Sequence, residues 1–166
     1  MNKKMMAVTA TMLMTLSAAG CSKPATTAEA PAAAAPAVAA ETSEADMKAV
    51  LDRHVTNVKA GNVDGVLADY TDDATLVLMP GDLAAKGALV GKTEVRKFFT
   101  WLASPEVLPG AQSMVVTTEK LGPNTMYFGF TQWPGTPKEV KGYDIYVFRE
   151  GKILFQTTFA TDMPKS

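Results

Sequence analysis

Four strand-like stretches follow one another in the second half of the chain, and they restrict the possible folds more than any other feature. Each is rich in β-branched and aromatic residues, and apolar and polar positions tend to alternate along it. The stretches cover residues 112–120, 125–132, 140–149 and 152–162. Tight turns such as Glu150-Gly151 join strands that run antiparallel. The second half of the chain therefore predicts a mainly antiparallel sheet.

Three helical patterns precede this sheet. The first begins after Ser43, a suitable N-cap, and ends at Gly61, a suitable C-cap. A shorter helix over residues 63–70 follows, and a third begins near Thr93, after a short strand at residues 75–79. Helices followed by hairpin-linked strands are typical of an α+β fold, in which a strongly curved sheet packs on the helices.

The first part of the chain has a different composition. Lys3 and Lys4 precede an uncharged apolar stretch, and small residues then lead to Cys21, the only cysteine. This order predicts a secretory signal peptide over residues 1–20, whose apolar stretch is too short to span a membrane. Alanine and proline dominate residues 22–42, which predicts a flexible linker following Cys21. Residues 43–166 are then one domain of ordinary size.

The end of the signal peptide resembles the bacterial lipobox, in which a cysteine receives diacylglycerol before cleavage. The matching residues are Ala18-Ala19-Gly20-Cys21, and Ala18 stands where leucine is usual. This resemblance implies an exported lipoprotein, acylated with palmitate or a similar chain, that is held at a membrane through Cys21. Because Ser22 rather than an acidic residue follows the cysteine, we expect the outer membrane, with the domain facing the periplasm. The alternative is an ordinary signal peptide cleaved near Ala19, which leaves a free thiol at Cys21.

Charge and motif content exclude several functions. The chain has 16 basic and 17 acidic residues and no basic stripe, so nucleic-acid binding has no support. No spacing of histidine, cysteine and carboxylate residues indicates a metal site, and the pair Asp72-Asp73 fits a turn between a helix and a strand. No glycine-rich phosphate loop or dinucleotide fingerprint is present either. We therefore expect neither a metal nor a cofactor.

One segment of the domain resembles a known family. Residues 60–75, AGNVDGVLADYTDDAT, are similar to the N-terminal signature of the SnoaL-like and ketosteroid-isomerase-like families of the nuclear transport factor 2-like superfamily. Pro80, the start of the third helix at Gly91 and the terminal stretch 148–153 also match. The resemblance implies a cone-shaped, cystatin-like α+β barrel with a pocket at its open end. Because this superfamily contains both enzymes and proteins without chemistry, the fold alone does not imply a reaction.

Comparison with the isomerase pattern shows which catalytic groups are present. The isomerase's general base precedes the proline that ends the first strand, and here Met79 occupies that position. A thioether accepts no proton at useful pH, so that mechanism is lost. His54 and Asp144 occupy the places of the tyrosine and aspartic acid that form the isomerase's oxyanion hole. The two oxyanion-hole positions thus keep polar side chains, whereas the position of the general base does not.

Strand periodicity independently places Asp144 on the inner face of the sheet. Asp144, Tyr146 and Phe148 share one face by the period of two. An enclosed aspartate has a raised pKa and needs a partner, and His54 on the apolar stripe of the first helix is a candidate. The two are either a packed polar pair or an acid–base dyad. Further candidates for lining the pocket are Tyr70, Met79, Phe98, Trp101, Met114, Phe128, Tyr146 and Phe148.

Three functions remain open at this point. The favoured hypothesis is a membrane-anchored lipoprotein whose domain binds a small apolar ligand in the pocket. The second is an isomerase, cyclase or hydrolase that uses Asp144 with His54 as an acid–base pair. The third is a non-catalytic scaffold that forms a homodimer through the outer face of its sheet.

Overall fold

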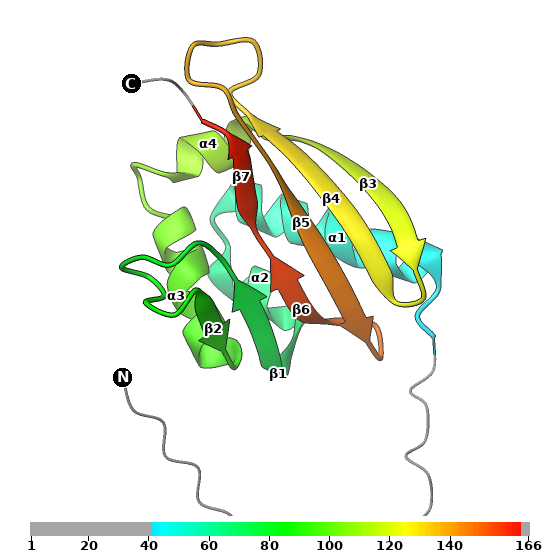
Figure 1. The fold of residues 1–166 in the computed structure, drawn as a ribbon. Helices are drawn as coiled ribbons and strands as arrows, with labels where there is room; N and C mark the ends of the chain where they lie inside the picture. Colours follow the sequence, from blue (N-terminus) through cyan, green and yellow to red (C-terminus); the bar gives the residue numbers. More distant parts are fainter. Residues whose placement is uncertain (1–40, 164–166) are drawn as a thin grey trace, which may run out of the picture. The chain divides into compact units, whose positions relative to one another are not determined.

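A computed structural model describes residues 41–163, so Cys21, the predicted signal peptide and nearly all of the predicted linker lie outside the described residues. The described part contains four helices and seven strands (Figure 1). The helices are α1 (Glu44–Ala60), α2 (Val63–Ala68), α3 (Lys92–Leu102) and α4 (Leu108–Ser113). The strands are β1 (Tyr70–Val77), β2 (Ala88–Val90), β3 (Val115–Gly122), β4 (Thr125–Gln132), β5 (Val140–Arg149), β6 (Lys152–Thr157) and β7 (Phe159–Asp162).

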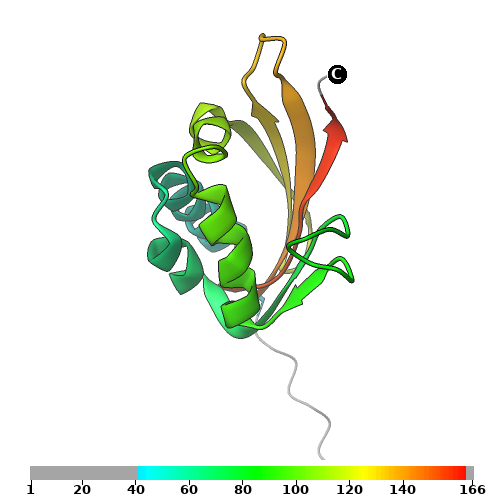
Figure 2. The same cartoon turned by 90° about the vertical axis from the view of Figure 1, so that its left-hand side faces the viewer.

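The strands form one curved sheet that packs against the helices. Its order is β2-β1-β6-β5-β4-β3, with β7 beside β5, and only the β1–β6 pair is parallel. Seen from the side, the sheet bends around the helices on one face and stays open (Figure 2). The predicted α+β class with a strongly curved, mainly antiparallel sheet is confirmed. The expected barrel is not closed.

Helix α1 follows the sequence prediction closely. The Ser43 side chain accepts a hydrogen bond from the backbone N–H of Asp46 at 3.1 Å, and Gly61 ends the helix with a φ of 66°. One face of α1 is buried against the sheet, and it carries Met47, Val50, Leu51, His54 and Val58. The only histidine of the chain therefore lies in the core.

The other predicted element boundaries change in ways that affect the site. Helix α2 ends at Ala68, and Tyr70 begins β1 instead of ending a helix. The Tyr70 ring is fully buried beneath α1. A fourth helix, α4, was not among the three predicted helices, and it includes Pro109. Proline fits there because the first turn of a helix leaves its N–H groups unbonded.

The last predicted strand divides into β6 and β7 around Thr158. The backbone N–H of Thr158 donates to the carbonyl of Val77 on β1, while β7 continues beside β5. At this point Gly142 of β5 lies beneath the Phe130 ring, and a Cβ there would be 2.3 Å from it. Glycine thus permits the close packing of these strands at the end of the sheet near the β4–β5 loop.

The start of the described chain is attached to the opposite end of β4. The backbone N–H of Thr42 donates to the Asn124 side chain at 2.6 Å, and Thr42 is buried. Asn124 precedes β4, whereas Gln132 ends it. Within residues 41–163 no helix has both the length and the apolar character required to cross a membrane.

Candidate functional site

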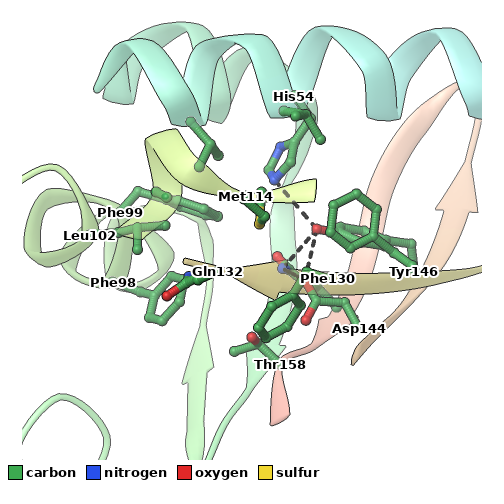
Figure 3. Close-up of a pocket in the computed structure, with 15 residues that line it drawn as sticks. His54, Phe98, Phe99, Leu102, Met114, Phe130, Gln132, Asp144, Tyr146 and Thr158 are labelled. Atoms are coloured by element: carbon green, nitrogen blue, oxygen red, sulfur yellow. Dashed lines mark hydrogen bonds between the residues drawn. The ribbon is translucent and has the colours of Figure 1, made fainter. Parts of the chain in front are cut away.

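A cavity of about 60 Å³ lies between the helices and the inner face of the sheet. Helices α1, α3 and α4 and strands β4, β5 and β6 contribute its walls (Figure 3). Most of the lining is apolar and consists of Val55, Val58, Phe98, Phe99, Leu102, Ala111, Met114, Phe128 and Phe130. The polar lining residues are His54, Gln132, Asp144, Tyr146, Gln156 and Thr158.

Strand register brings most of the polar groups together. Asp144 and Tyr146 are two residues apart on β5, so both side chains point to the inner face. On β6, Gln156 pairs directly with Tyr146, which places its amide beside both side chains. Helix α1 lies across this face and directs His54 toward the same point (Figure 3).

These residues form a buried hydrogen-bond network. Gln156 Nε2 donates to Asp144 Oδ2 at 2.8 Å and to the Tyr146 hydroxyl at 2.9 Å. The Tyr146 hydroxyl donates to the same Oδ2 at 3.0 Å and lies 3.4 Å from His54 Nε2. On the far side of Gln156, the hydroxyl of Tyr70 donates to Oε1. Five buried side chains therefore share one continuous network.

Two atoms of this network have no partner. Asp144 Oδ1 and His54 Nδ1 are buried, and neither has a hydrogen bond within residues 41–163. A buried polar atom without a partner costs about 1–3 kcal/mol. Asp144 lines the cavity, and beside Gln156 and Tyr146 the Thr158 hydroxyl is the other polar group of the lining that acts on its carboxyl. Oδ1 makes no hydrogen bond to Thr158 or to any other described residue, so it can bond a molecule that enters.

Burial controls the protonation of both groups. Loss of hydration raises the pKa of Asp144 from 3.8 to about 7, although the side chains of Gln156, Thr158 and Tyr146 favour the ionised form. Burial lowers the pKa of His54 from 6.5 to about 3, and the positive charge of Arg53 adds to this. The histidine is therefore neutral near pH 7, whereas the carboxyl changes its charge there.

Aromatic rings surround the histidine and hold it in place. The His54 ring lies 5.5 Å from Phe99 and 5.7 Å from both Tyr70 and Tyr146, measured between ring centroids. Burial also raises the pKa of both tyrosines well above the ordinary value. Their hydroxyls stay protonated and act as hydrogen-bond donors.

The structure brings six of the predicted site residues to the cavity. His54 and Asp144 line it together with Phe98, Met114, Phe128 and Tyr146. The expected direct pairing of His54 with Asp144 is not found, because the Tyr146 hydroxyl lies between them. Catalytic roles for the two remain a prediction.

Four other candidates lie elsewhere. Met79 follows the end of β1 and is 68% exposed, and Trp101 on the outer side of α3 is 44% exposed. Neither lines the cavity, because strand β1 stops at Val77 and the helix turns the indole toward solvent. Tyr70 and Phe148 are buried in the core, where Tyr70 supports the network from behind.

Sequence reasoning missed three polar residues of the lining. Gln156 is almost fully buried, whereas Gln132 and Thr158 are partly exposed. Strand alternation gave no signal for Gln156, because it falls three residues after the buried Ile153 and would lie on the opposite face without the irregularity in the β5–β6 pairing. Only the strand register shows that this amide meets Asp144.

A second buried acid lies outside the cavity. Asp69 ends α2, is 1% exposed and accepts a hydrogen bond from Arg53 Nε at 2.7 Å. Its other oxygen has no partner in the described part of the chain. Burial raises the pKa of Asp69 against the opposing effect of Arg53. This pair connects α1 to the start of β1, and its role is structural.

The arrangement suits recognition of one polar group on an otherwise apolar molecule. Asp144 Oδ2 already accepts two hydrogen bonds, so only Oδ1 is available. Oδ1 can accept a hydrogen bond when ionised and donate one when protonated. Among residues 41–163, no three histidine, cysteine or carboxylate side chains are grouped to hold a metal ion.

Comparison with solved structures shows the same fold in proteins of low sequence identity. A nuclear transport factor 2-like protein of unknown function from Burkholderia xenovorans shares 20% identity over 74% of this chain and 88% of its own, with a TM-score of 0.56. A cystatin-like protein of unknown function from Methylobium petroleophilum shares 14% identity over 76% and 82%, with a TM-score of 0.55. A nuclear transport factor 2-like protein from Anabaena variabilis shares 19% over 75% and 97%, with a TM-score of 0.56.

Sequence comparison identifies the family. No curated protein matches the chain significantly. The profile of the SnoaL-like domain, however, matches residues 51–155, which include α1 from Leu51 onward and most of β6. Because the matched region exceeds half of the chain and the fold agrees, the protein belongs to the SnoaL-like domain family of the nuclear transport factor 2-like superfamily.

Proposed function

We propose that the domain binds a small, largely apolar ligand whose single polar group hydrogen-bonds to Asp144. The observation that carries this proposal is the buried, unpartnered Oδ1 of a residue lining an apolar cavity. Apolar walls with few polar groups are typical of small-molecule sites. The fold supports ligand binding or isomerase-type chemistry in general, and the unpartnered oxygen of Asp144 supports a polar group on the ligand.

The size of the cavity restricts the ligand. A volume of about 60 Å³ is below the ~150 Å³ of an engineered cavity that takes benzene. The cavity is also well below the ~300–1,000 Å³ of a site for a drug-sized molecule. We therefore expect a ligand no larger than a small ring, such as cyclopentane, which the partly exposed Phe130 side chain can move to admit.

A matched ligand series tests this proposal. Cyclopentane, cyclopentanol and cyclopentanone differ only in their polar group, and binding is followed by amide and methyl NMR shifts of the full chain. Relative to cyclopentane, we expect the two oxygen-containing rings to bind about tenfold more tightly than their free energies of transfer from water to hydrocarbon predict. The reason is that one hydrogen bond to a buried group contributes about 1–1.5 kcal/mol.

The variant Asp144→Leu provides the control for this series. It removes the free oxygen and should abolish the preference while retaining cyclopentane binding. The proposal fails if none of the three rings shifts the resonances of cavity residues. It also fails if the preference survives in Asp144→Leu.

A second function, acid–base catalysis, is favoured by the pKa of about 7 at Asp144. A group with this pKa can both donate and accept a proton near neutral pH. His54 would take part only through the Tyr146 hydroxyl. An isomerisation, cyclisation or hydrolysis of this kind requires a bell-shaped or stepped pH–rate profile near pH 7. Equal turnover by Asp144→Asn would exclude it.

We also propose that the domain is tethered to a membrane by a lipid on Cys21. The lipobox-like sequence supports the anchor, and the outer membrane, facing the periplasm, is the expected location. Thr42 enters at the Asn124 end of β4, whereas Gln132 at the other end lines the cavity. At about 3.3 Å per residue these ends are about 25 Å apart, so the described chain begins away from the Gln132 end of the cavity.

Metabolic labelling tests the anchor. Cells given labelled palmitate should incorporate the label into the wild-type protein, whereas Cys21→Ser should remain unlabelled. An unlabelled wild-type protein in a host with an active lipoprotein pathway would contradict the proposal. This experiment is independent of ligand binding, so either proposal can fail alone.

A further inference from the structure

Gln156 makes hydrogen bonds to three other side chains of the network. Its two amide hydrogens bond Asp144 Oδ2 and the Tyr146 hydroxyl, and its carbonyl accepts from Tyr70. The residue is 2% exposed. Both N–H groups and the carbonyl oxygen of the Gln156 amide are therefore hydrogen-bonded, and these bonds define its orientation.

Tyr70 determines which way the amide faces. The Tyr70 hydroxyl has one proton, and the burial of its ring leaves Gln156 Oε1 as its acceptor. If the amide were turned over, its carbonyl would face the carboxylate oxygen, and the phenol would lose its acceptor. The Tyr70 bond therefore holds the NH₂ group toward Asp144.

We infer that Gln156, oriented by Tyr70, is a positioning residue that occupies Oδ2 of Asp144 and leaves Oδ1 as the atom that meets the ligand. This inference rests on the proposed function. Because Oδ2 already accepts from Gln156 and Tyr146, a proton that binds the carboxyl goes to Oδ1. The network thus fixes both the position and the hydrogen-bonding character of the recognition atom.

The pKa of the Asp144 carboxyl depends on the groups that face it. The titratable groups facing it are His54 from α1, Tyr70 from β1 and Tyr146 from β5. Helices α3 and α4 contribute apolar side chains to the lining, and β4 adds two phenylalanines and Gln132. No lysine or arginine of the described residues lines the cavity. Of the side chains that favour the ionised form of Asp144, Gln156 lowers its pKa most, ahead of Thr158 and Tyr146.

The test measures the pKa of Asp144 directly. Aspartate carboxyl carbons of the full chain are labelled with ¹³C and titrated, and the Asp144 signal is assigned by its loss in Asp144→Asn. In Gln156→Met, which keeps the length of the side chain but has no donor, the pKa should rise by about one pH unit, equivalent to tenfold in proton affinity. The matched control Gln132→Met changes the other glutamine of the lining and should leave this pKa unchanged.

Tyr70→Phe removes only the hydroxyl that orients the amide, and it should raise the pKa of Asp144 by a smaller amount. An unchanged pKa in a folded Gln156→Met protein would overturn the inference, as would an equal rise in Gln132→Met. If either variant fails to fold, the wild type still decides the question. The side-chain ¹⁵N signal of Gln156 must then titrate with the midpoint of the Asp144 carboxyl, and a different midpoint or no titration would overturn the inference.

These measurements need no ligand, so they separate the inference from the proposed function. If the pKa changes as expected but none of the cyclopentane series binds, Gln156 controls the carboxyl of a site that does not take such ligands. If the rings bind with the expected preference but the pKa in Gln156→Met does not change, ligand binding stands and the positioning role is wrong.

Discussion

Folding of this domain should transfer a proton from His54 to Asp144 without changing the number of protons bound. In the unfolded chain near pH 5, the histidine is charged and the aspartate is ionised, because their ordinary pKa values are 6.5 and 3.8. In the folded protein the pKa values are about 3 and about 7, so the aspartate carries the proton and the histidine is neutral. We therefore expect the contributions of these two groups to cancel in the pH dependence of stability.

The contributions of Asp144 and His54 to stability change with pH in opposite directions. The folded pKa of Asp144 is raised, so its contribution to stability is complete below pH 3.8 and is lost as the pH rises through 7. The folded pKa of His54 is lowered, so its contribution is complete above pH 6.5 and is lost as the pH falls toward 3. Shifts of about three pH units correspond to about 4 kcal/mol for each group. Between pH 4 and 6.5 the two slopes have similar size and opposite sign.

Urea unfolding of the full chain between pH 4 and 6.5 checks this argument. Asp144→Asn retains only the histidine effect, so its free energy of unfolding should increase with pH by about 3 kcal/mol relative to the wild type. His54→Phe keeps an aromatic ring in place and retains only the aspartate effect, so its value should decrease by about the same amount. The double variant should run parallel to the wild type, because every other titrating group is common to all four proteins.

Two results would refute this reasoning. If both single variants run parallel to the wild type, neither group has a shifted pKa in the folded protein. If the wild type diverges from the double variant by more than about 1 kcal/mol across this range, the two effects do not cancel. The second result would indicate that the folded pKa of Asp144 or of His54 lies inside this pH range.

Two further substitutions test the packing that surrounds the site. Gly142→Ala should lower the free energy of unfolding by about 1–3 kcal/mol, because the new Cβ would overlap the Phe130 ring on β4. In the same sheet, the Cβ of Gly122→Ala would have no atom within 4 Å, so this variant should change the free energy of unfolding by less than about 1 kcal/mol. Urea unfolding of both variants measures the difference. Arg53→Met should cost at least about 2 kcal/mol by leaving Asp69 buried without its cation, whereas Lys48→Met removes an exposed pair and should cost less than about 1 kcal/mol, as thermal unfolding would show.

Local signals predicted the elements that position the site. The N-cap and C-cap of α1 placed His54 on a buried helical face, and strand alternation placed Asp144 and Tyr146 on the inner face of β5. The limits of β4 and β5 agree with the predicted ranges. These features depend on residues near one another in the sequence, and for that reason the sequence alone reveals them.

The contacts that the sequence did not reveal depend on how distant segments of the chain pair. Whether Gln156 or another residue of β6 meets Asp144 depends on the pairing of β5 with β6, which includes a bulge between Val147 and Phe148. Tyr70 was assigned to a helix because it continues the spacing of Val66 and Leu67. The chain instead enters β1 there, which directs the phenol hydroxyl to the network.

The two buried acids of the described chain show why Asp144 is better explained by the proposed ligand or reaction than by stability. Each has one oxygen without a hydrogen bond in residues 41–163, which costs about 1–3 kcal/mol. For Asp69 the other oxygen contacts the charged Arg53, which ties two elements together, and the residue does not line the cavity. For Asp144 only neutral donors are present, and an apolar side chain of similar volume would stabilise the fold more. A buried acid without a cation, on the wall of an apolar cavity, lowers stability, and either the proposed ligand or the proposed acid–base reaction would account for its presence.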